Sequence, residues 1–254
     1  MNKRFILLLL IFFLSICSCV YATGNDANTV SLLHMNGADQ STTFTDDAAG
    51  GTHSWTAYLG AQIDTAQKEF GTASGLFDGV DSYISTGDSA DWNFGAGNFT
   101  IDFWVRFNSL TAYDVFITQY QDAENEWVLR RDDTTNQLYF YCNVPGATII
   151  EVPTSGLSLN VNTWYHIALV RNGSNFQIYV DGVSYASVTD TSDMPDFTGS
   201  LYIGMRGNLI HHPFDGWLDE VRVSKGIARW TANFTPPTEE YNGAVGQVIM
   251  ISSD

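Results

Sequence analysis

The first chemistry that this sequence suggests is cation binding by oxygen atoms. Residues 35–47 follow an apolar run and are rich in carboxylate, amide and hydroxyl groups, with acids at Asp39, Asp46 and Asp47. Calcium is a hard cation that takes its ligands from such side chains and from loop carbonyls. Aspartates in loops also form β-turns by bonding to nearby backbone groups, so turn chemistry is the simpler explanation for most of these acids.

A second carboxylate would complete such a site. Asp219 shares the alternation of Val221 and Val223, which predicts that its side chain faces the interior of the fold. A buried carboxylate needs a compensating cation or several hydrogen bonds. We therefore predict that Asp39 and Asp219 are calcium ligands, together with other loop acids and backbone carbonyls. The alternative is that Asp219 accepts only backbone N–H hydrogen bonds.

Recognition of sugars is suggested by aromatic residues in predicted turns and at predicted strand ends. A sugar ring stacks on an aromatic face, while carboxylate and amide groups bond to its hydroxyls. Tyr113, Tyr120 and Trp127 occur in one short segment that also contains Asp, Gln and Asn residues. We predict that these three aromatics form a ligand-binding rim, with structural packing as the alternative for each of them.

The arrangement of acids does not favour catalysis. Retaining glycosidases hold two carboxyl groups roughly 5 Å apart, which a strand achieves by placing them at alternate positions. Glu124 and Glu126 have this spacing but lie at a polar turn, whereas Asp219 and Glu220 are adjacent and are expected to face opposite sides. None of the common hydrolase or phosphate-binding motifs occurs. A polysaccharide hydrolase or lyase therefore stays an alternative to a binding protein.

The elements that must position these residues are β-strands. From 162 to 182 apolar and polar residues alternate, break at a polar turn at 171–174, and then alternate again, which predicts an antiparallel hairpin. No segment of helical period is long enough to predict a substantial helix. The predicted strands are Val30–His34, Gly75–Phe77, Tyr83–Ser85, Phe99–Phe107, Val115–Gln119, Glu126–Arg130, Gln137–Asn143, Thr148–Val152, Trp164–Arg171, Phe176–Val180, Leu201–Met205 and Leu218–Val223.

So many short strands predict an all-β fold, a two-sheet antiparallel β-sandwich. In the strand from 99 to 107, Ile101, Phe103 and Val105 share one face and are expected in the core. His166 is expected to be a half-buried strand residue.

Several segments resemble the laminin-G-like, concanavalin A-like lectin/glucanase modules. They are W-Y-H-I-A-L-V-R-N-G with I-Y-V-D-G (164–182), G-L-F-D-G-V-D-S-Y-I (75–84), F-T-I-D-F-W-V-R (99–106), F-D-G-W-L-D-E-V-R-V (214–223) and a closing segment at 226–238. The resemblance covers 30–241. It implies a jelly roll, in which a calcium ion often joins the first loop to the last strand. Trp230 lies in the closing segment, so the resemblance also implies that it packs against the fold rather than binds a ligand. Such modules occur in lectins, adhesins, receptors and glycan-cleaving enzymes, so the resemblance leaves the function open.

Composition limits the partners. The chain has 28 acidic against 11 basic residues and a net charge of −17, which disfavours nucleic acid and anionic membranes as partners. Of three cysteines, only Cys142 lies outside the N-terminal region, so we expect no disulfide within one mature chain. The core, aided by a bound metal, must then provide the stability.

The N-terminus has the pattern of a secretory signal. Residues 1–22 combine a basic start, an apolar run and small residues before the expected cleavage site. A lipid anchor through Cys19 is the alternative. We predict one jelly-roll domain over 23–241 and a C-terminal extension over 242–254.

These observations together predict a secreted lectin- or adhesin-like protein that binds an extracellular glycan or cell-surface polymer and is stabilised by calcium. It would not insert into a membrane, and it could form oligomers. A self-assembling extracellular structural protein is a further alternative, in which the C-terminal strand would be exchanged between copies.

Overall fold

The computed structural model describes residues 24–207 and 212–242. The predicted signal peptide with Cys19, and the predicted extension beyond residue 242, lie outside the described residues. Among the described residues, no helix has the length and apolarity needed to cross a bilayer.

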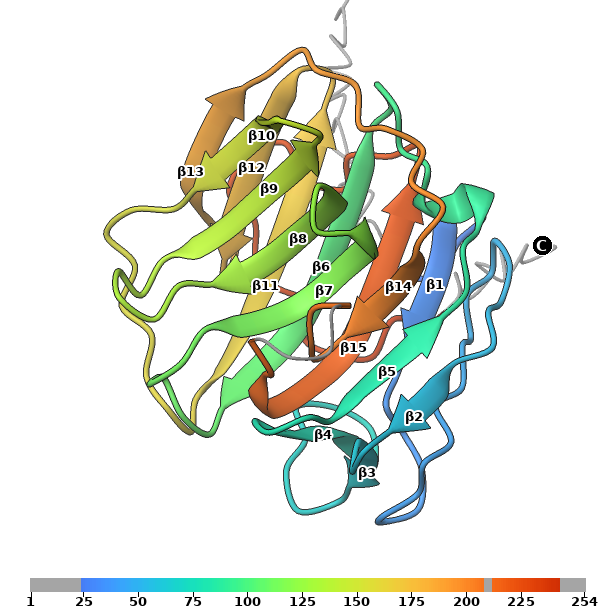
Figure 1. Cartoon of the computed structure of the whole chain (residues 1–254). Coiled ribbons are helices and arrows are strands. Elements are labelled where there is room, and N and C mark those ends of the chain that lie inside the picture. Colours follow the sequence, from blue (N-terminus) through green and yellow to red (C-terminus); the bar gives the residue numbers. More distant parts are fainter. Residues whose placement is uncertain (1–23, 208–211, 243–254) are drawn as a thin grey trace, which may run out of the picture.

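The alternating segments of the sequence form two antiparallel sheets that lie face to face (Figure 1). The eight-stranded sheet has the order β13 (Val183–Thr189), β12 (Asn175–Val180), β11 (Trp164–Asn172), β6 (Phe99–Phe107), β15 (Asp215–Lys225), β4 (Ser74–Asp78), β3 (Gln62–Asp64), and β1 (Thr29–Leu33) pairs with the far end of β15. The predicted all-β, two-sheet antiparallel sandwich is confirmed.

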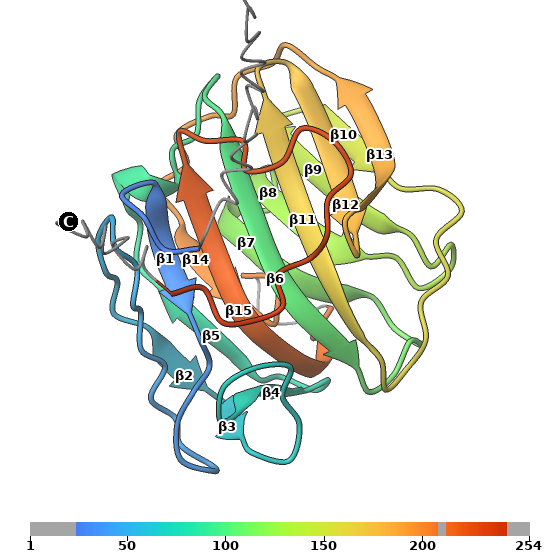
Figure 2. The same ribbon diagram turned by 180° about the vertical axis from the view of Figure 1, so that it is seen from behind.

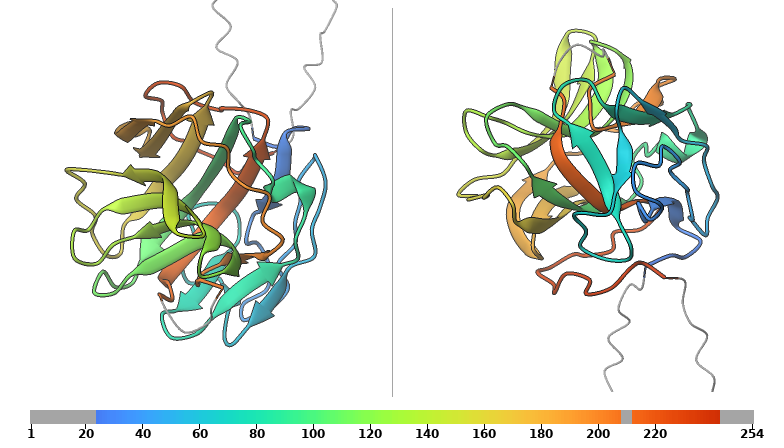
Figure 3. Two further views of the ribbon diagram at one scale, coloured as in Figure 1. Left: turned by 45° about the horizontal axis from the view of Figure 1, so that its top comes forward. Right: turned by 90° about the horizontal axis from the view of Figure 1, so that it is seen from below.

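The seven-stranded sheet lies in front in Figure 1. Its order is β10 (Ala147–Pro153), β9 (Leu138–Val144), β8 (Asn125–Arg131), β7 (Asp114–Asp122), β14 (Ser200–Ile203), β5 (Tyr83–Thr86) and β2 (Thr56–Tyr58). The described residues also include one 3-10 turn, η1 (Ala90–Trp92). Figure 3 shows from another direction how this sheet covers the eight-stranded sheet.

The core fills the space between the sheets with the inward side chains of both. The ring of Phe103 in β6 lies 5.3 Å from that of Phe116 in β7, and the ring of Phe99 in β6 lies 6.4 Å from that of Phe140 in β9, measured between centroids. The predicted core face of β6 is fully buried. Because side chains alternate along a strand, the opposite side of each sheet carries a separate set of residues.

The outer face of the eight-stranded sheet is covered by residues 226–242, here called the C-terminal strap, which cross it in Figure 2. Trp230 stacks on Phe234 with ring centroids 4.1 Å apart, and the pair packs against Ala168, Val170 and Tyr179. The predicted packing of Trp230 is confirmed. This cover is apolar, so the strap closes the outer face of that sheet much as a second layer would.

A buried ion pair lies beneath the strap. Arg222 donates from Nε and Nη2 to the two carboxylate oxygens of Asp102 at 2.9 and 3.0 Å, and both side chains are fully buried. The hydroxyl of Tyr241 donates to Asp102 Oδ2 at 2.5 Å, and Nη1 of Arg222 donates to the Gly24 carbonyl at 2.8 Å. Burial opposes ionisation of Asp102, but the Arg222 charge and the hydrogen bonds outweigh it and lower the pKa to about 2.

His166 belongs to the same network, because its Nε2 lies 3.4 Å from Asp102 Oδ2 and 3.1 Å from the Tyr241 hydroxyl. The prediction that His166 is half-buried was wrong: the side chain is fully buried. The sequence pattern places His166 on the outer face of a strand. There it is covered by Trp104 of β6 and by the strap, with Trp230 and Phe234 in edge contact.

Replacing Asp102 with Asn is expected to reduce the free energy of unfolding by about 3–5 kcal/mol, because it leaves the buried Arg222 without its counter-ion. Urea denaturation at neutral pH measures this change. Asp91→Asn is the matched control: Asp91 accepts from His53 at the surface, so its loss is expected to cost less than about 1 kcal/mol.

The pH dependence gives a second readout of the Asp102→Asn comparison. Since the folded pKa of Asp102 lies below its unfolded value, its stabilisation is present above about pH 4 and is lost as the pH falls towards 2. The wild type should therefore lose part of its advantage over Asp102→Asn in that range. An unchanged difference between the two proteins from pH 7 to pH 2 would contradict this account.

Candidate functional site

The two outer faces of the sandwich differ in what covers them. The strap closes the outer face of the eight-stranded sheet, whereas no comparable segment among the described residues crosses the outer face of the seven-stranded sheet (Figures 1 and 2). Binding of a large ligand requires an accessible face. The outer face of the seven-stranded sheet is therefore the candidate functional site.

Tyrosines follow one another across this face. Tyr58 in β2 stacks on Tyr83 in β5 with centroids 4.6 Å apart, and Tyr83 lies 5.9 Å from Tyr202 in β14. Tyr120 in β7 and Tyr141 in β9 continue the series. With Tyr113 and Tyr139, seven of the twelve tyrosines of the chain lie on or beside this face: Tyr58, Tyr83, Tyr113, Tyr120, Tyr139, Tyr141 and Tyr202.

At one end of the tyrosine series the face is hollowed into a pocket of about 260 Å³. Its lining residues are Tyr113, Val115, Arg130, Tyr141, Arg206 and His212. The pocket joins β7, β8 and β9 to the loop after β14. It therefore combines flat aromatic rings with guanidinium groups, which is suited to a ligand with both an apolar face and polar or anionic groups.

One of the two arginines in the pocket is neutralised by the protein. Arg206 donates from Nε and Nη2 to the two oxygens of Glu126 at 2.8 and 2.6 Å, and Glu126 is fully buried. Tyr141 donates its hydroxyl to the same carboxylate at 3.3 Å. Glu126 thus serves to fix Arg206 and Tyr141 in the pocket wall.

Arg130 is less completely paired. Its Nη1 lies 3.6 Å from Oδ2 of Asp132, and its Nε is buried without a hydrogen-bond partner among the described residues. The guanidinium carbon lies 4.8, 5.3 and 5.6 Å from the ring centroids of Tyr113, Tyr139 and Tyr141. A cation held between rings in this way keeps hydrogen-bonding capacity for a ligand.

The structure separates the three aromatics that the sequence predicts as a rim. Tyr113 lines the pocket, and Tyr120 lies on the same face with its ring 5.5 Å from the Arg206 guanidinium. Trp127 is buried between the sheets, where its ring contacts Phe94, and it therefore offers no face to a ligand. The alternation of β8 indicates this direction. Trp127 shares its phase with Leu129, which faces the core, whereas Arg130 has the opposite phase and faces outward.

The residues that sequence reasoning missed here are Arg130, Tyr139, Tyr141 and Arg206. Tyr139 and Tyr141 alternate with inward Phe140, so their outward direction is readable from the sequence once the strand is assigned. Arg206 gives no such signal. It comes from a loop between two strands, and only the pairing of β14 with β7 brings it to the pocket.

The predicted calcium ligands lie against one loop, residues 64–73. Oδ1 of the exposed Asp39 accepts from the Thr65 amide at 3.2 Å. The buried Asp219 accepts through Oδ2 from the amides of Glu69 and Phe70 at 2.9 and 3.0 Å, and burial raises its pKa to about 8. Backbone N–H groups thus occupy the Asp219 carboxylate, as in the alternative to calcium. Calcium binding stays a prediction.

The direction of Asp219 differs from the prediction. A β-bulge in β15 sets two residues, Glu220 and Val221, opposite one residue of β6, and Glu220 has a positive φ of 50°. The bulge moves Asp219 out of phase with Val221, so Asp219 pairs with Trp104 and faces the outer side beneath the 64–73 loop. The prediction that Asp219 faces the interior between the sheets was therefore wrong.

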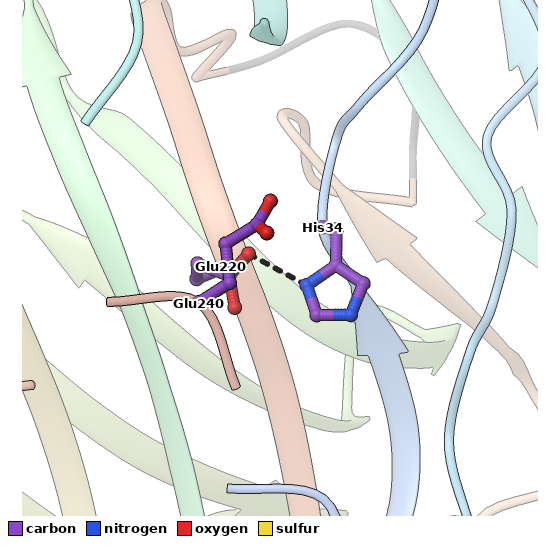
Figure 4. Close-up of side chains that lie close together, drawn as sticks. All are labelled: His34, Glu220 and Glu240. Atoms are coloured by element: carbon purple, nitrogen blue, oxygen red, sulfur yellow. Dashed lines mark hydrogen bonds and ion pairs between the residues drawn. The ribbon is translucent and has the colours of Figure 1, made fainter. Parts of the chain in front are cut away.

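Among the residues that the structure describes, one group has the donor atoms and proximity for a metal ion: His34, Glu220 and Glu240 (Figure 4). It contains neither Asp39 nor Asp219. It lies at the junction of β1, β15 and the strap, on the other sheet from the tyrosine-lined face.

The fold and this geometry define a jelly-roll sandwich with one accessible, aromatic outer face. The family model described as the concanavalin A-like lectin/glucanases superfamily matches residues 77–229, and the chain belongs to this family. The resemblance of the sequence to these modules is thereby confirmed. No curated protein sequence matches the chain.

Solved structures with this fold include carbohydrate-binding domains. Domain 4 of the arabinanase AbnA from Geobacillus stearothermophilus, solved with arabinotriose, has a TM-score of 0.62 at 15% identity, covering 79% of this chain and 94% of that domain. The binding domain of Paraclostridial Mosquitocidal Protein 1 has a TM-score of 0.59 at 20% sequence identity, and the match covers 80% of this chain and 50% of that one. A structure of botulinum neurotoxin type C, whose cell entry depends on interaction with two ganglioside molecules, has a TM-score of 0.59 at 13% sequence identity. The match covers 80% of this chain and 49% of that one. The chain thus spans about half the length of both toxin structures.

Replacing Asp219 with Asn distinguishes hydrogen bonding from calcium binding. Both carboxylate oxygens of Asp219 accept backbone N–H groups, whereas Asn has only one acceptor oxygen, so we expect a loss of about 1–3 kcal/mol in the free energy of unfolding. Thermal melting of wild type and variant, with calcium and with EDTA, measures it. The structure predicts the same loss in both buffers, whereas a loss confined to the calcium buffer would place a cation at Asp219.

Proposed function

We propose that this protein binds carbohydrate outside the cell through the outer face of its seven-stranded sheet, and that its pocket receives a sugar with a carboxylate group. The observation that carries the proposal is the position of Arg130, a cation held between tyrosine rings in a pocket at the end of a tyrosine series. Stacking surfaces and a fixed cation are the two elements that recognition of an acidic sugar needs.

The tyrosine series supports an extended ligand. From Tyr58 in β2 the outward tyrosines run through β5, β14 and β7, and after β8, which contributes Arg130, the series ends at Tyr141 in β9. Tyr83 is buried, and the other rings give sugar units apolar faces to cover, with hydroxyls at their edges for hydrogen bonds. A polysaccharide or the glycan of a cell-surface molecule fits this arrangement better than a single small molecule would.

The charges support a ligand with few acidic groups. With a net charge of −17, the chain repels polyanions at long range. A lone carboxylate, by contrast, gains a short charge-assisted bond to Arg130 inside a partly desolvated pocket. We therefore propose a largely neutral glycan with an occasional uronic or sialic acid, rather than a densely charged polymer.

Carbohydrate recognition is also consistent with the structures that share this fold. The arabinanase domain was solved with arabinotriose, and cell entry of botulinum neurotoxin type C depends on interaction with gangliosides. Because the sequence identity to these structures is low, the similarity concerns the fold alone, and the ligand proposed for this chain is argued from its own residues. Export through the predicted signal peptide would bring the protein to such ligands.

Replacing Arg130 with Gln is expected to weaken binding of an acid-bearing oligosaccharide by roughly 10- to 100-fold, because a hydrogen bond to a charged group contributes about 1.5–3 kcal/mol. A glycan array with uronic-acid, sialic-acid and neutral oligosaccharides selects the ligand, and titration calorimetry measures affinity. Arg106→Gln is the matched control, because Arg106 stacks on Trp217 on the other sheet, 4.9 Å from the ring centroid.

Two outcomes would count against this proposal. Equal loss of affinity in Arg106→Gln and Arg130→Gln would place the ligand elsewhere, and a wild type that binds no oligosaccharide would remove carbohydrate binding altogether. Release of reducing or unsaturated ends from a bound polysaccharide would instead support the hydrolase or lyase alternative.

Replacing Tyr202 with Ala tests whether the ligand extends along the tyrosine series. One lost stacking contact is expected to lower affinity by about 0.5–1.5 kcal/mol, roughly 2- to 12-fold, for long oligosaccharides that reach β14. Ligands that fill only the pocket should bind unchanged. Tyr185→Ala, in β13 of the other sheet, is the control, and an equal effect on short and long ligands would contradict an extended site.

A further inference from the structure

The strongest unassigned group of side chains lies where three segments of the chain meet, away from the proposed carbohydrate site. His34 follows β1, Glu220 lies in the bulge of β15, and Glu240 lies near the end of the strap (Figure 4). Nδ1 of His34 is 2.6 Å from Oε1 of Glu220, and one donor atom from each of the three residues lies within 4.8 Å of the others.

Neighbouring groups hold both carboxylates in place and leave oxygen atoms directed at the imidazole. Glu220 accepts the Tyr241 amide through Oε2 at 2.8 Å, which leaves Oε1 to face His34. Oε1 of Glu240 accepts from Nδ2 of Asn36 at 2.5 Å. A Cβ on Gly71 would collide with Glu240, so the glycine makes room for this carboxylate. Orientation of ligands by an outer layer of hydrogen bonds is typical of metal sites.

The charges around the group are unbalanced. Glu220 is 1% exposed, and Glu240 and Asp47 add negative charge around the one imidazole. A divalent cation bound between these carboxylates would offset two of the negative charges.

We propose that His34, Glu220 and Glu240 bind a divalent transition-metal ion of the Zn²⁺ type. One imidazole nitrogen and two carboxylate oxygens form a set of three protein ligands, which leaves a fourth tetrahedral position for water. An imidazole ligand selects such ions over calcium, which takes six to eight oxygen ligands. The ion would join β1, β15 and the strap, and so fasten the cover of the eight-stranded sheet.

Titration of the metal-free protein with zinc chloride tests the site. We expect calorimetry to show one Zn²⁺ per chain, and thermal melting to show a higher Tm with zinc, because an ion that binds the native state stabilises it. Cobalt(II) in place of zinc should give visible absorption bands of four-coordinate geometry. This spectrum reports on the ligands independently of stability.

Variants assign the ligands. His34→Gln and Glu240→Gln are each expected to weaken zinc binding at least tenfold and to alter the cobalt spectrum, while circular dichroism confirms folding. His53→Gln is the matched control. His53 also pairs with a carboxylate, that of Asp91, but it does not belong to a group of three potential metal ligands among the described residues. It should bind zinc like the wild type.

The proposal fails if the folded wild type binds no zinc, or if His34→Gln and Glu240→Gln bind it unchanged. It also fails if calcium alone raises Tm and Asp219→Asn abolishes that effect, which would assign the cation to the predicted calcium ligands. Carbohydrate binding is measured separately on the other sheet, so each proposal can fail without the other.

Discussion

The buried pair of Asp102 and Arg222 is the interaction on which the asymmetry of this sandwich depends. It lies on the outer side of the eight-stranded sheet, where a solvent-exposed surface would usually be. The hydroxyl of Tyr241 and the carbonyl of Gly24 complete its hydrogen bonds, so both ends of the described chain are fastened over the same sheet. A charged pair removed from water needs such complete partnering, and breaking it is costly. The strap therefore covers one face, and the other is the face that we propose for ligand binding.

The free face acquires its character from alternation. Most inward residues of the seven-stranded sheet are apolar and complete the core, while its outward positions carry tyrosines and Arg130, and Arg206 joins them from the loop after β14. Glu126 shows how this surface is kept rigid, because it is buried and fixes both Arg206 and Tyr141. Rigid aromatic and guanidinium groups lose little conformational entropy when a ligand binds. A pocket lined by tyrosine rings and two arginines therefore suits the proposed recognition of a glycan.

The β-bulge in β15 gives the adjacent acids Asp219 and Glu220 different partners on the same side of the sheet. Without it, Asp219 and Glu220 would lie on opposite sides of a regular strand. With Glu220 at positive φ, both acids are buried on the outer side but meet different partners. Asp219 accepts backbone N–H groups of one loop, whereas Glu220 faces His34. Of these two adjacent carboxylates, that of Asp219 therefore holds a loop in place and that of Glu220 belongs to the proposed metal site.

The sequence alone determined the fold class, most strand positions and the inward face of β6, because alternation and turn residues are local signals. It missed β2, β3 and β13, whose runs are short or polar. Tertiary structure decided what covers each face: His166 lies on the outer side of the eight-stranded sheet and is buried there by Trp104 and the strap. It also decided which distant groups meet, such as Arg206 with the pocket and Glu240 with His34. Such meetings depend on strand order and on a bulge, which no periodicity along a single segment encodes.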